Sequence, residues 1–369
     1  MEELTPREIA WATTMGGHRV SGVVTAHEGK PSQIAAGAPI GRVQREEREA
    51  AELRPGATRA QGAGRRKIPE EPDVERTCFE RDRDRIVHST AFRRLAGKTQ
   101  VVVFPADHER TRLTHALEVA QVATSVARGV GANVTLTDAI ALGHDCGHGP
   151  GGHASEDAFD AFIPGGYDHG AWGADVVLDG LNLCAETLDG IRNHSWSRPK
   201  PSTVEGEIVS WADRVAYCAH DLEDAVRAGI VTAKDIPAQV VQVAGASRRE
   251  QLAVFIRSLI SNTCRNGFVC MDAETAEALS ALRAFNYERI YTREESLAQS
   301  RAVVEVLQAL VTHYIEHPND LPADAQGPDV LRAAVTYVAG MTDRFAFDTA
   351  VRLLDYDPAK LPKGIGQAC

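Results

Sequence analysis

The helical spacing of apolar residues most limits what this chain can fold into. From Asp73 onward, apolar side chains recur every three or four residues, and Gly or Pro residues separate the segments. Such a period places the apolar side chains along one face of a helix, where they pack against other helices. We therefore expect an all-α fold with at most a minor β-hairpin, since Gln100–Phe104 is a short run of β-like composition.

Composition and periodicity divide the chain into four regions. Residues 1–41 are rich in Gly, Ala, Ser and Thr without a sustained period, which is typical of a poorly ordered tail. Residues 42–246 contain a charged helix, a basic loop and a first series of amphipathic helices. Residues 247–357 continue helix after helix, and we expect them to pack on the preceding region. Residues 358–369 form a tail rich in Pro and Gly.

Capping residues predict where several of these helices begin and end. One helix is expected over residues 78–95, and a strongly amphipathic one over Arg112–Val130. Thr137 is a suitable N-cap for the next helix. Ser202 and Glu205 have the spacing of a capping box, which predicts the start of another long helix.

Charge and cysteine usage exclude some classes of protein. The net charge of −11 disfavours a protein whose main role is to coat nucleic acid, although a local basic groove remains compatible with it. No apolar run approaches the roughly 18 residues of a membrane span, and the acidic start lacks a signal pattern. The seven cysteines include no C-x-x-C pair. They are expected to be reduced thiols in a cytoplasmic protein that does not bind membranes.

Histidine and aspartate residues on three predicted helices form a set of ligands for a divalent metal. The set is His115 on the first helix, the adjacent His144 and Asp145 at the end of the second, and Asp213 on the third. Imidazole and carboxylate groups together suit ions such as Mn, Fe, Co, Ni or Mg. Neighbouring side chains in a regular helix point about 100° apart. We therefore expect the backbone to leave helical geometry at His144, with Gly147 supplying conformational freedom.

A possible proton-transfer pair follows the His-Asp pair. His153 and Glu156 are three residues apart, so they lie on one face of a helix. A carboxylate that binds an imidazole fixes its tautomer and raises its basicity. Elsewhere such a pair is more often structural. Directly after a metal-binding pair, it indicates a general acid or base.

Positive charge gathers upstream of His115. The stretch from Arg76 to Arg112 contains nine Arg and Lys residues against five acids. Arg112 lies three residues before His115 and can share its helix face, where a guanidinium could hold a phosphate. The alternative for Arg112 is an ion pair with a neighbouring Asp or Glu. Ion pairs are the favoured interpretation for the alternating residues Arg81, Asp82, Arg83, Asp84 and Arg85.

The predicted third helix carries further candidates beside Asp213. Tyr217 is four residues later and would face the same side, where it could contact a sugar or a phosphate or be a core aromatic. Arg214 could offer charge to a polyphosphate. His220 is interpreted as structural.

Six segments carry a resemblance to a known family, and together they span roughly residues 42–357. The segments are Arg81–Ser89, Phe92–Gln100, Arg110–Gln121, His144–His153, Trp211–Tyr217 and Gly340–Arg344. In combination they resemble the HD-domain superfamily of metal phosphohydrolases. Within it, the chain is similar to bacterial deoxyguanosinetriphosphate triphosphohydrolase-like proteins. The resemblance implies the HD-domain helical fold with additional C-terminal helices.

The resemblance also implies an activity and roles for individual residues. The family hydrolyses deoxynucleoside triphosphates to deoxynucleosides and inorganic triphosphate. The four residues of the metal set would bind one divalent ion (Mn, Co, Mg, Fe, Ni or Zn). His153 would be the catalytic histidine at the α-phosphate with Glu156 as its partner. The positions matching substrate contacts of relatives are Arg112, His148, Tyr217 and, in different surroundings, His169.

Two departures from the family pattern concern the substrate. Many relatives have Gln where this chain has Ala96, at a place linked to deoxyribose recognition. Relatives often have Pro-Phe-Gly-His where this chain has Pro-Gly-Gly-His at 150–153. The resemblance further implies a homo-oligomer, and some relatives need a second nucleotide as activator.

Two other functions are compatible with the sequence. The same metal site could serve a nucleotidase or phosphodiesterase that acts on other nucleotides. A protein from another class, a nucleotide sensor or single-stranded DNA-binding module with little catalysis, would use Arg65, Arg66, Lys67 and the Arg76–Arg112 stretch.

Overall fold

The computed structural model describes residues 4–14, 16–101 and 109–363. The chain divides into two compact units, Met1–Ile40 and Gly41–Cys369. The first unit contains α1 (Pro6–Thr14) and an antiparallel pair of strands, β1 (His18–Val20) and β2 (Val23–Thr25). The sequence predicted a poorly ordered tail for residues 1–41, and the structure gives parts of this region a helix and a hairpin. No residue of these three elements is buried, so they contribute nothing to a hydrophobic core.

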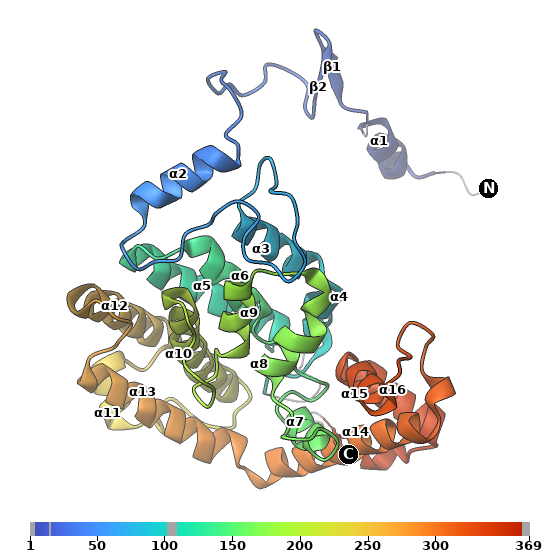
Figure 1. Ribbon diagram of the computed structural model, residues 1–369. Coiled ribbons are helices and arrows are strands. Elements are labelled where there is room, and N and C mark those ends of the chain that lie inside the picture. Colours follow the sequence, from blue (N-terminus) through green and yellow to red (C-terminus); the bar gives the residue numbers. More distant parts are fainter. Residues whose placement is uncertain (1–3, 15, 102–108, 364–369) are drawn as a thin grey trace. The chain divides into compact units, whose positions relative to one another are not determined.

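The second unit is built from helices, as the sequence predicted (Figure 1). Its first helices are α2 (Arg42–Glu52), α3 (Cys78–His88), α4 (Thr90–Arg94), α5 (Arg112–Val130), α6 (Val134–Gly143), α7 (Ala154–Asp160), α8 (His169–Trp172), α9 (Ala185–Arg192) and α10 (Val204–Arg227). Its later helices are α11 (Ala238–Ala244), α12 (Arg248–Asn266), α13 (Ala273–Asn286), α14 (Glu294–Glu316), α15 (Val330–Ala339) and α16 (Asp343–Leu354). The all-α expectation is confirmed.

Three predicted helix boundaries are wrong in detail. Ser89 interrupts the helix expected over residues 78–95, because its extended backbone and its side chain, which accepts from the Phe92 N–H, cap a new helix. The N-cap of α6 is Asn133 rather than Thr137. Thr203 caps α10, in place of the predicted capping box.

The predicted β-like run at Gln100–Phe104 cannot be compared in full. Residues 102–104 lie outside the described residues, and Gln100 and Val101 are not part of a strand. Next to the run, Thr99 and Thr111 form an isolated antiparallel bridge.

A first hydrophobic core surrounds α5, α6 and α10. These helices contact one another, α3 packs on α6, and α12 packs on α5 (Figure 1). Val119, Val126, Ile140 and Val215 are fully buried between them. This packing brings together the three helices that carry the predicted metal ligands.

A second hydrophobic core lies around α14, which contacts α7, α15 and α16. Phe159, Val306, Leu310 and Phe347 are buried in it. Figure 1 shows α14 as a long helix that extends from the neighbourhood of α13 to α15 and α16. The C-terminal helices therefore pack directly on α7, the helix that begins after His153.

A buried aspartate at the start of α16 ties the C-terminal helices to the loops around the predicted site. Asp343 accepts hydrogen bonds from the backbone and hydroxyl of Thr99 and, at 2.8 Å, from the backbone N–H of Gly151. Lys98 is also buried and donates to the carbonyl of Ala339 at 2.9 Å. Burial lowers the pKa of the Lys98 ammonium to about 8.

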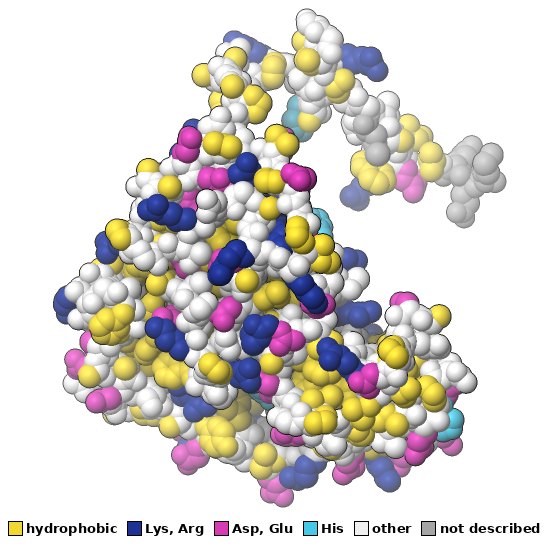
Figure 2. All heavy atoms as spheres, viewed as in Figure 1, with side chains coloured by type: hydrophobic (Ala, Val, Ile, Leu, Met, Phe, Trp, Pro, Cys, Tyr) yellow, Lys and Arg dark blue, Asp and Glu magenta, His cyan; other side chains and the backbone are white. Residues whose placement is uncertain are grey.

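The basic loop at residues 65–67 is held by acidic partners. Arg66 is buried and pairs with Asp82 at 2.6 Å. Arg65 pairs with Glu186 and Lys67 with Asp179 at the surface. On the face in Figure 2, Lys and Arg side chains are interspersed with Asp and Glu. These pairings weaken the interpretation of this loop as a groove for single-stranded DNA.

Among the residues that the structure describes, no helix combines the length and apolar character that crossing a bilayer requires.

The Arg66–Asp82 pair generates a stability prediction. Asp82 also accepts from the Cys184 N–H and the Thr187 hydroxyl, so Asp82→Ala leaves several buried donors without a partner. We expect it to cost about 3–5 kcal/mol of unfolding free energy, measured by urea denaturation. The matched control is Asp84→Ala, two residues away. Its partner Arg76 is half-exposed, so about 0–1 kcal/mol is expected. Equal losses for both variants would contradict this account.

Candidate active site

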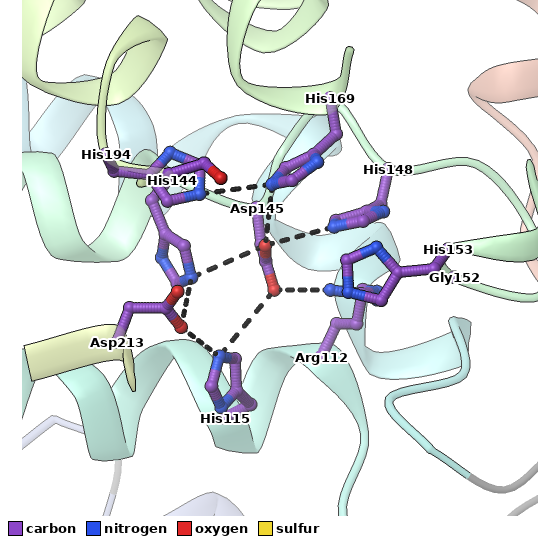
Figure 3. A network of polar contacts seen from close by, with 12 residues as sticks. Arg112, His115, His144, Asp145, His148, Gly152, His153, His169, His194 and Asp213 are labelled. Carbon is purple, nitrogen blue, oxygen red and sulfur yellow. Dashed lines mark hydrogen bonds and ion pairs between the residues drawn. The ribbon is translucent and has the colours of Figure 1, made fainter. Parts of the chain in front are cut away.

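Side chains from α5, α10 and the end of α6 meet at one point, as the sequence predicted. The Nε2 atom of His115 lies 3.1 Å from Oδ1 of Asp213 and 3.9 Å from Oδ2 of Asp145. The Nε2 atom of His144 lies 3.4 Å from Oδ1 of Asp145 and 3.7 Å from Oδ1 of Asp213. Figure 3 shows Asp145 at the centre of the network, with Asp213 and His115 on one side.

Gly147 permits this arrangement in a different way from the one expected. Its φ angle is not positive, so the turn does not need glycine for conformational freedom. A Cβ atom at position 147 would instead lie 2.0 Å from the carbonyl oxygen of His169. Glycine is required here because another backbone segment passes too close for any side chain.

The hydrogen bond of His144 fixes the direction of its ring. Its Nδ1 atom donates to the carbonyl of Ala141 at 2.7 Å, so Nε2 is the atom that faces the cluster. Among the described residues this Nε2 atom has no hydrogen-bond partner, and it lies near the carboxylates of Asp145 and Asp213. A neutral ring would direct a lone pair at two carboxylates there, which is unfavourable unless a cation lies between them. The donor set therefore fits a divalent metal ion.

Arg112 forms an ion pair, which was the alternative to its interpretation as a phosphate contact. Its Nη1 atom donates to Oδ2 of Asp145 at 2.7 Å, and both side chains are buried. Burial alone would raise the pKa of Asp145, but the Arg112 guanidinium and the nearby His144 and His148 hold that pKa well below its usual range. Nε and Nη2 of Arg112 have no partner among the described residues, so the guanidinium retains donors for another group.

Glu156 connects two histidines. Its Oε2 atom accepts from Nδ1 of His153 at 2.8 Å, and its Oε1 atom lies 2.8 Å from Nδ1 of His169. Burial opposes ionisation of Glu156, but the hydrogen bonds from both imidazoles hold its pKa far below the usual range. The His153 side chain is 72% exposed, whereas that of His169 is 9% exposed. The predicted pair is therefore present, with a second histidine bound to the same carboxylate.

His148 lies between these groups. Its Nε2 atom is 3.3 Å from Oδ1 of Asp145, and its ring stacks on that of His169 with centroids 3.7 Å apart. Burial and the Arg112 guanidinium keep the pKa of His148 well below its usual value, so the ring is neutral at pH 7.

A cavity of about 450 Å³ opens on this network. Of the predicted site residues, it is lined by Arg112, His115, Asp145, His148, His153, His169, Asp213, Arg214 and Tyr217. Tyr217 accepts a hydrogen bond from Arg283 at 2.9 Å, and the guanidinium of Arg214 lies 3.5 Å from the ring centroid of Trp196. The cavity thus combines carboxylates and imidazoles with arginines and aromatic rings.

Comparison with known proteins identifies the family. Residues 112–218 match the HD domain, and residues 269–352 match the phosphohydrolase-associated domain. A deoxyguanosinetriphosphate triphosphohydrolase-like protein of Caldanaerobacter subterraneus is 40% identical over 312 residues, which cover 81% of this chain and 89% of that protein. Two more proteins of that name, from Clostridium perfringens and Rhodopseudomonas palustris, are 37% and 35% identical, with 77% and 79% of this chain and 89% and 94% of theirs covered.

The chain belongs to the deoxyguanosinetriphosphate triphosphohydrolase-like family of HD-domain phosphohydrolases. A solved phosphohydrolase structure from Bacteroides thetaiotaomicron is also similar, with 16% identity and a TM-score of 0.48 over 74% of this chain and 68% of that chain. HD domains bind divalent metals, and this phosphohydrolase has a His/Asp cluster that could hold one.

The structure places the two positions at which the resemblance implies a departure from the family pattern. Ala96 is exposed and is not among the described residues that line the cavity, whereas Gln100 is. Gly151 has φ of +73°, and a Cβ atom there would lie 2.4 Å from a methyl group of Val303. A larger residue at position 151 would therefore require the Val303 side chain on α14 to shift.

Sequence reasoning missed several residues of the site. His194 follows α9, and its Nε2 atom lies 3.1 Å from that of His169. Asp221, Arg283 and Tyr291 line the cavity, and the Tyr291 hydroxyl donates to Asp221 at 2.5 Å. One signal for His194 existed: like His144, it follows the end of a helix and precedes a segment that breaks the helix.

Because the His and Asp donor set suits a divalent metal ion, we expect divalent ions to stabilise the folded phosphohydrolase. Adding Mn²⁺ to chelator-treated protein at about 100 times Kd should stabilise it by about 2.7 kcal/mol, which corresponds to a rise in Tm of roughly 2–4 °C. In Asp213→Ala, the rise should fall to less than half. The control is Asp175→Ala, which removes a half-exposed carboxylate paired with Arg192. An undiminished shift in Asp213→Ala would contradict the assignment of Asp213 as a ligand.

Proposed function

We propose that this phosphohydrolase hydrolyses deoxynucleoside triphosphates to deoxynucleosides and inorganic triphosphate, with water attacking the α-phosphorus. One observation carries the proposal. The cluster of His115, Asp145 and Asp213 and the Glu156-bound His153 open on the same cavity, beside arginines and aromatic rings. The names of the relatives, which refer to deoxyguanosine triphosphate, support this substrate class.

His115, His144, Asp145 and Asp213 would hold the metal. When bound, a divalent ion there would neutralise charge on a phosphate and lower the pKa of water. The neighbouring residues keep these ligands in the protonation states that metal binding requires. The carbonyl of Ala141 keeps the proton of His144 on Nδ1, and Arg112 keeps Asp145 ionised.

His153 is the proposed proton-transfer residue. Glu156 holds its Nδ1 atom, which leaves Nε2 as the atom that takes a proton from water or gives one to the 5′-oxygen leaving group. The ring is exposed to the cavity and to solvent, whereas the His148 ring, which also lines the cavity, is buried.

The remaining lining suits the other parts of a nucleotide. The partnerless donors of Arg112, together with Arg214, could bind phosphate oxygens. Tyr217 and the Asp221–Tyr291 pair present hydroxyl and carboxyl groups of the kind that bind a sugar. Trp196 offers a ring on which a base could stack. A cavity of about 450 Å³ is within the usual range for a ligand of this size.

Product analysis tests this function. We expect the purified protein, supplied with Mn²⁺, Co²⁺ or Mg²⁺, to release inorganic triphosphate and a deoxynucleoside, detected by ion chromatography. The panel contains deoxynucleoside triphosphates singly and in pairs, because an activating nucleotide would show only in pairs. Release of orthophosphate from monophosphates, or cleavage of cyclic nucleotides alone, would instead establish the nucleotidase or phosphodiesterase alternative. Salt-dependent binding of single-stranded DNA without any turnover would favour the binding module.

The role of His153 gives a second prediction. His153→Ala should lower kcat by about 10²–10⁴-fold, since it removes the proton-transfer group, while metal content stays at the wild-type level. The control is His88→Ala, which removes an exposed histidine at the end of α3. If His153→Ala retained its metal and turned over within severalfold of wild type, His153 would not be the proton-transfer residue.

A further inference from the structure

We propose that Cys78 and Cys184 are a modification site, at which a hydroperoxide converts the two thiols into a reversible disulfide that ties α3 to α9. Both cysteines are free thiols in the structure. Neither is among the described residues that line the cavity. The inference does not rest on the proposed function, because thiol oxidation at this pair needs neither a nucleotide nor a metal.

The two thiols meet beneath one glycine, although they lie more than a hundred positions apart in the chain. Cys78 is the first residue of α3, and Cys184 is the N-cap of α9. A Cβ atom at Gly64 would lie 2.4 Å from Sγ of Cys184 and 3.2 Å from Sγ of Cys78. The thiols also form a hydrogen bond with each other. Two thiols in such contact are placed to form an S–S bond of about 2.05 Å.

A buried ion pair holds the backbone of both cysteines. Nη2 of Arg66 donates to the carbonyl of Cys78 at 3.0 Å, and the N–H of Cys184 donates to Oδ2 of Asp82 at 2.8 Å. Arg66 and Asp82 pair with each other at 2.6 Å, and Arg66 forms an isolated antiparallel bridge with Cys184. None of these contacts involves a sulfur atom, so they keep the two residues together in the reduced protein.

The surroundings make Cys78 the nucleophile of the pair. A hydrogen bond from the Cys184 thiol lowers the pKa of Cys78, although burial and the Asp82 carboxylate oppose this. The N-terminal end of α3 and the Arg66 guanidinium also favour the Cys78 thiolate. The hydrogen bond to Cys78 and burial raise the pKa of Cys184. Cys78 therefore ionises first, and Cys184 is its resolving partner.

One hydroperoxide accounts for the oxidation. The Cys78 thiolate attacks a peroxide oxygen, the O–O bond breaks, and the leaving hydroxide takes up the proton that the thiol released. Cys78 is then a sulfenic acid. The sulfur of Cys184 attacks the sulfur of Cys78, the S–S bond forms, and the S–O bond breaks to release water together with the Cys184 proton. Two thiols and one hydrogen peroxide thus give one disulfide and two waters, and a dithiol reductant reverses the reaction by exchange.

The segment that covers the thiols is held weakly at the surface. Gly64 is partly exposed and has φ of +76°, whereas both cysteines beneath it are fully buried. The neighbouring side chains of Arg65 and Lys67 are 76% and 67% exposed in their ion pairs with Glu186 and Asp179. Ion pairs so exposed contribute little to stability. We therefore expect local opening at Gly64 to admit a small peroxide while the core stays folded.

The disulfide would close the part of the chain that contains most of the candidate active site. The predicted ligands on α5 and at the end of α6 lie between Cys78 and Cys184, as do His153 and Glu156. Closing a loop of roughly 100 residues restricts the unfolded chain. We expect the oxidised protein to have a Tm at least about 5 °C above that of the reduced protein, and dithiothreitol to abolish the difference.

The test counts thiols in the full-length protein. Reduced protein is treated with a few equivalents of hydrogen peroxide and denatured, and its remaining thiols are labelled with N-ethylmaleimide. Intact-mass measurement should show five labels, in place of the seven that the reduced protein gives. A protease digest should contain the Cys78 peptide joined to the Cys184 peptide. In Cys184→Ser, the reaction should stop at the sulfenic acid of Cys78, which dimedone traps.

The matched control removes the two described cysteines that are only partly buried. Peroxide-treated Cys264→Ser/Cys270→Ser should still lose two thiols and give the same cross-linked peptide. Six or seven labels on peroxide-treated wild type would overturn the proposal, and so would a cross-link between other cysteines instead. If Cys184→Ser does not fold, as judged by circular dichroism, the wild-type label count and digest decide the question. A protein that forms this disulfide but releases no triphosphate from any nucleotide would refute the proposed function and leave the thiol site standing.

Discussion

The ionised, buried carboxylate of Asp145 is the interaction on which the rest of the site depends. An unpaired carboxylate costs several kcal/mol to bury, and here the side chain is 4% exposed. The Arg112 guanidinium at 2.7 Å offsets that cost from one side, and the imidazoles of His144, His148 and His169 surround the other oxygen. Arg112 therefore acts first as the structural partner of Asp145. Its phosphate-binding role, implied by the resemblance, is left to the N–H groups that remain without a partner.

Helix ends supply the imidazoles with a defined protonation. The last carbonyls of a helix lack intrahelical partners, and a histidine just beyond can donate to the one three residues earlier. His144 does this to Ala141, and His194 does it to Ile191. Each bond keeps a proton on Nδ1 and turns Nε2 toward the carboxylate of Asp145. The backbone therefore fixes how these rings present Nε2 to the site.

The sequence predicted the parts of the site that are local in the chain. The apolar period of helices such as α5 was sufficient to predict the all-α fold. The His144-Asp145 pair, with His115 and Asp213, was sufficient to predict a His/Asp cluster that could hold a metal. Helix starts were less predictable, because Thr137 and Asn133 are both good caps. The Thr137 hydroxyl instead donates to the Asn133 carbonyl inside the helix. Arg283 has no neighbouring motif, and only tertiary packing brings it and His194 to the cavity.

The C-terminal helices are part of the active-site scaffold rather than an addition to it. Asp343 accepts hydrogen bonds from Thr99 and Gly151. Both residues line the cavity, and they precede and follow Arg112 in the sequence. Val303 on α14 fills the space that a side chain at position 151 would need. The backbone that leads to His153 is thus held from outside the HD domain, while the exposed His153 ring is oriented by Glu156. We therefore expect changes in α14 or α16 to reach the proposed proton-transfer residue through the backbone of residues 150–153.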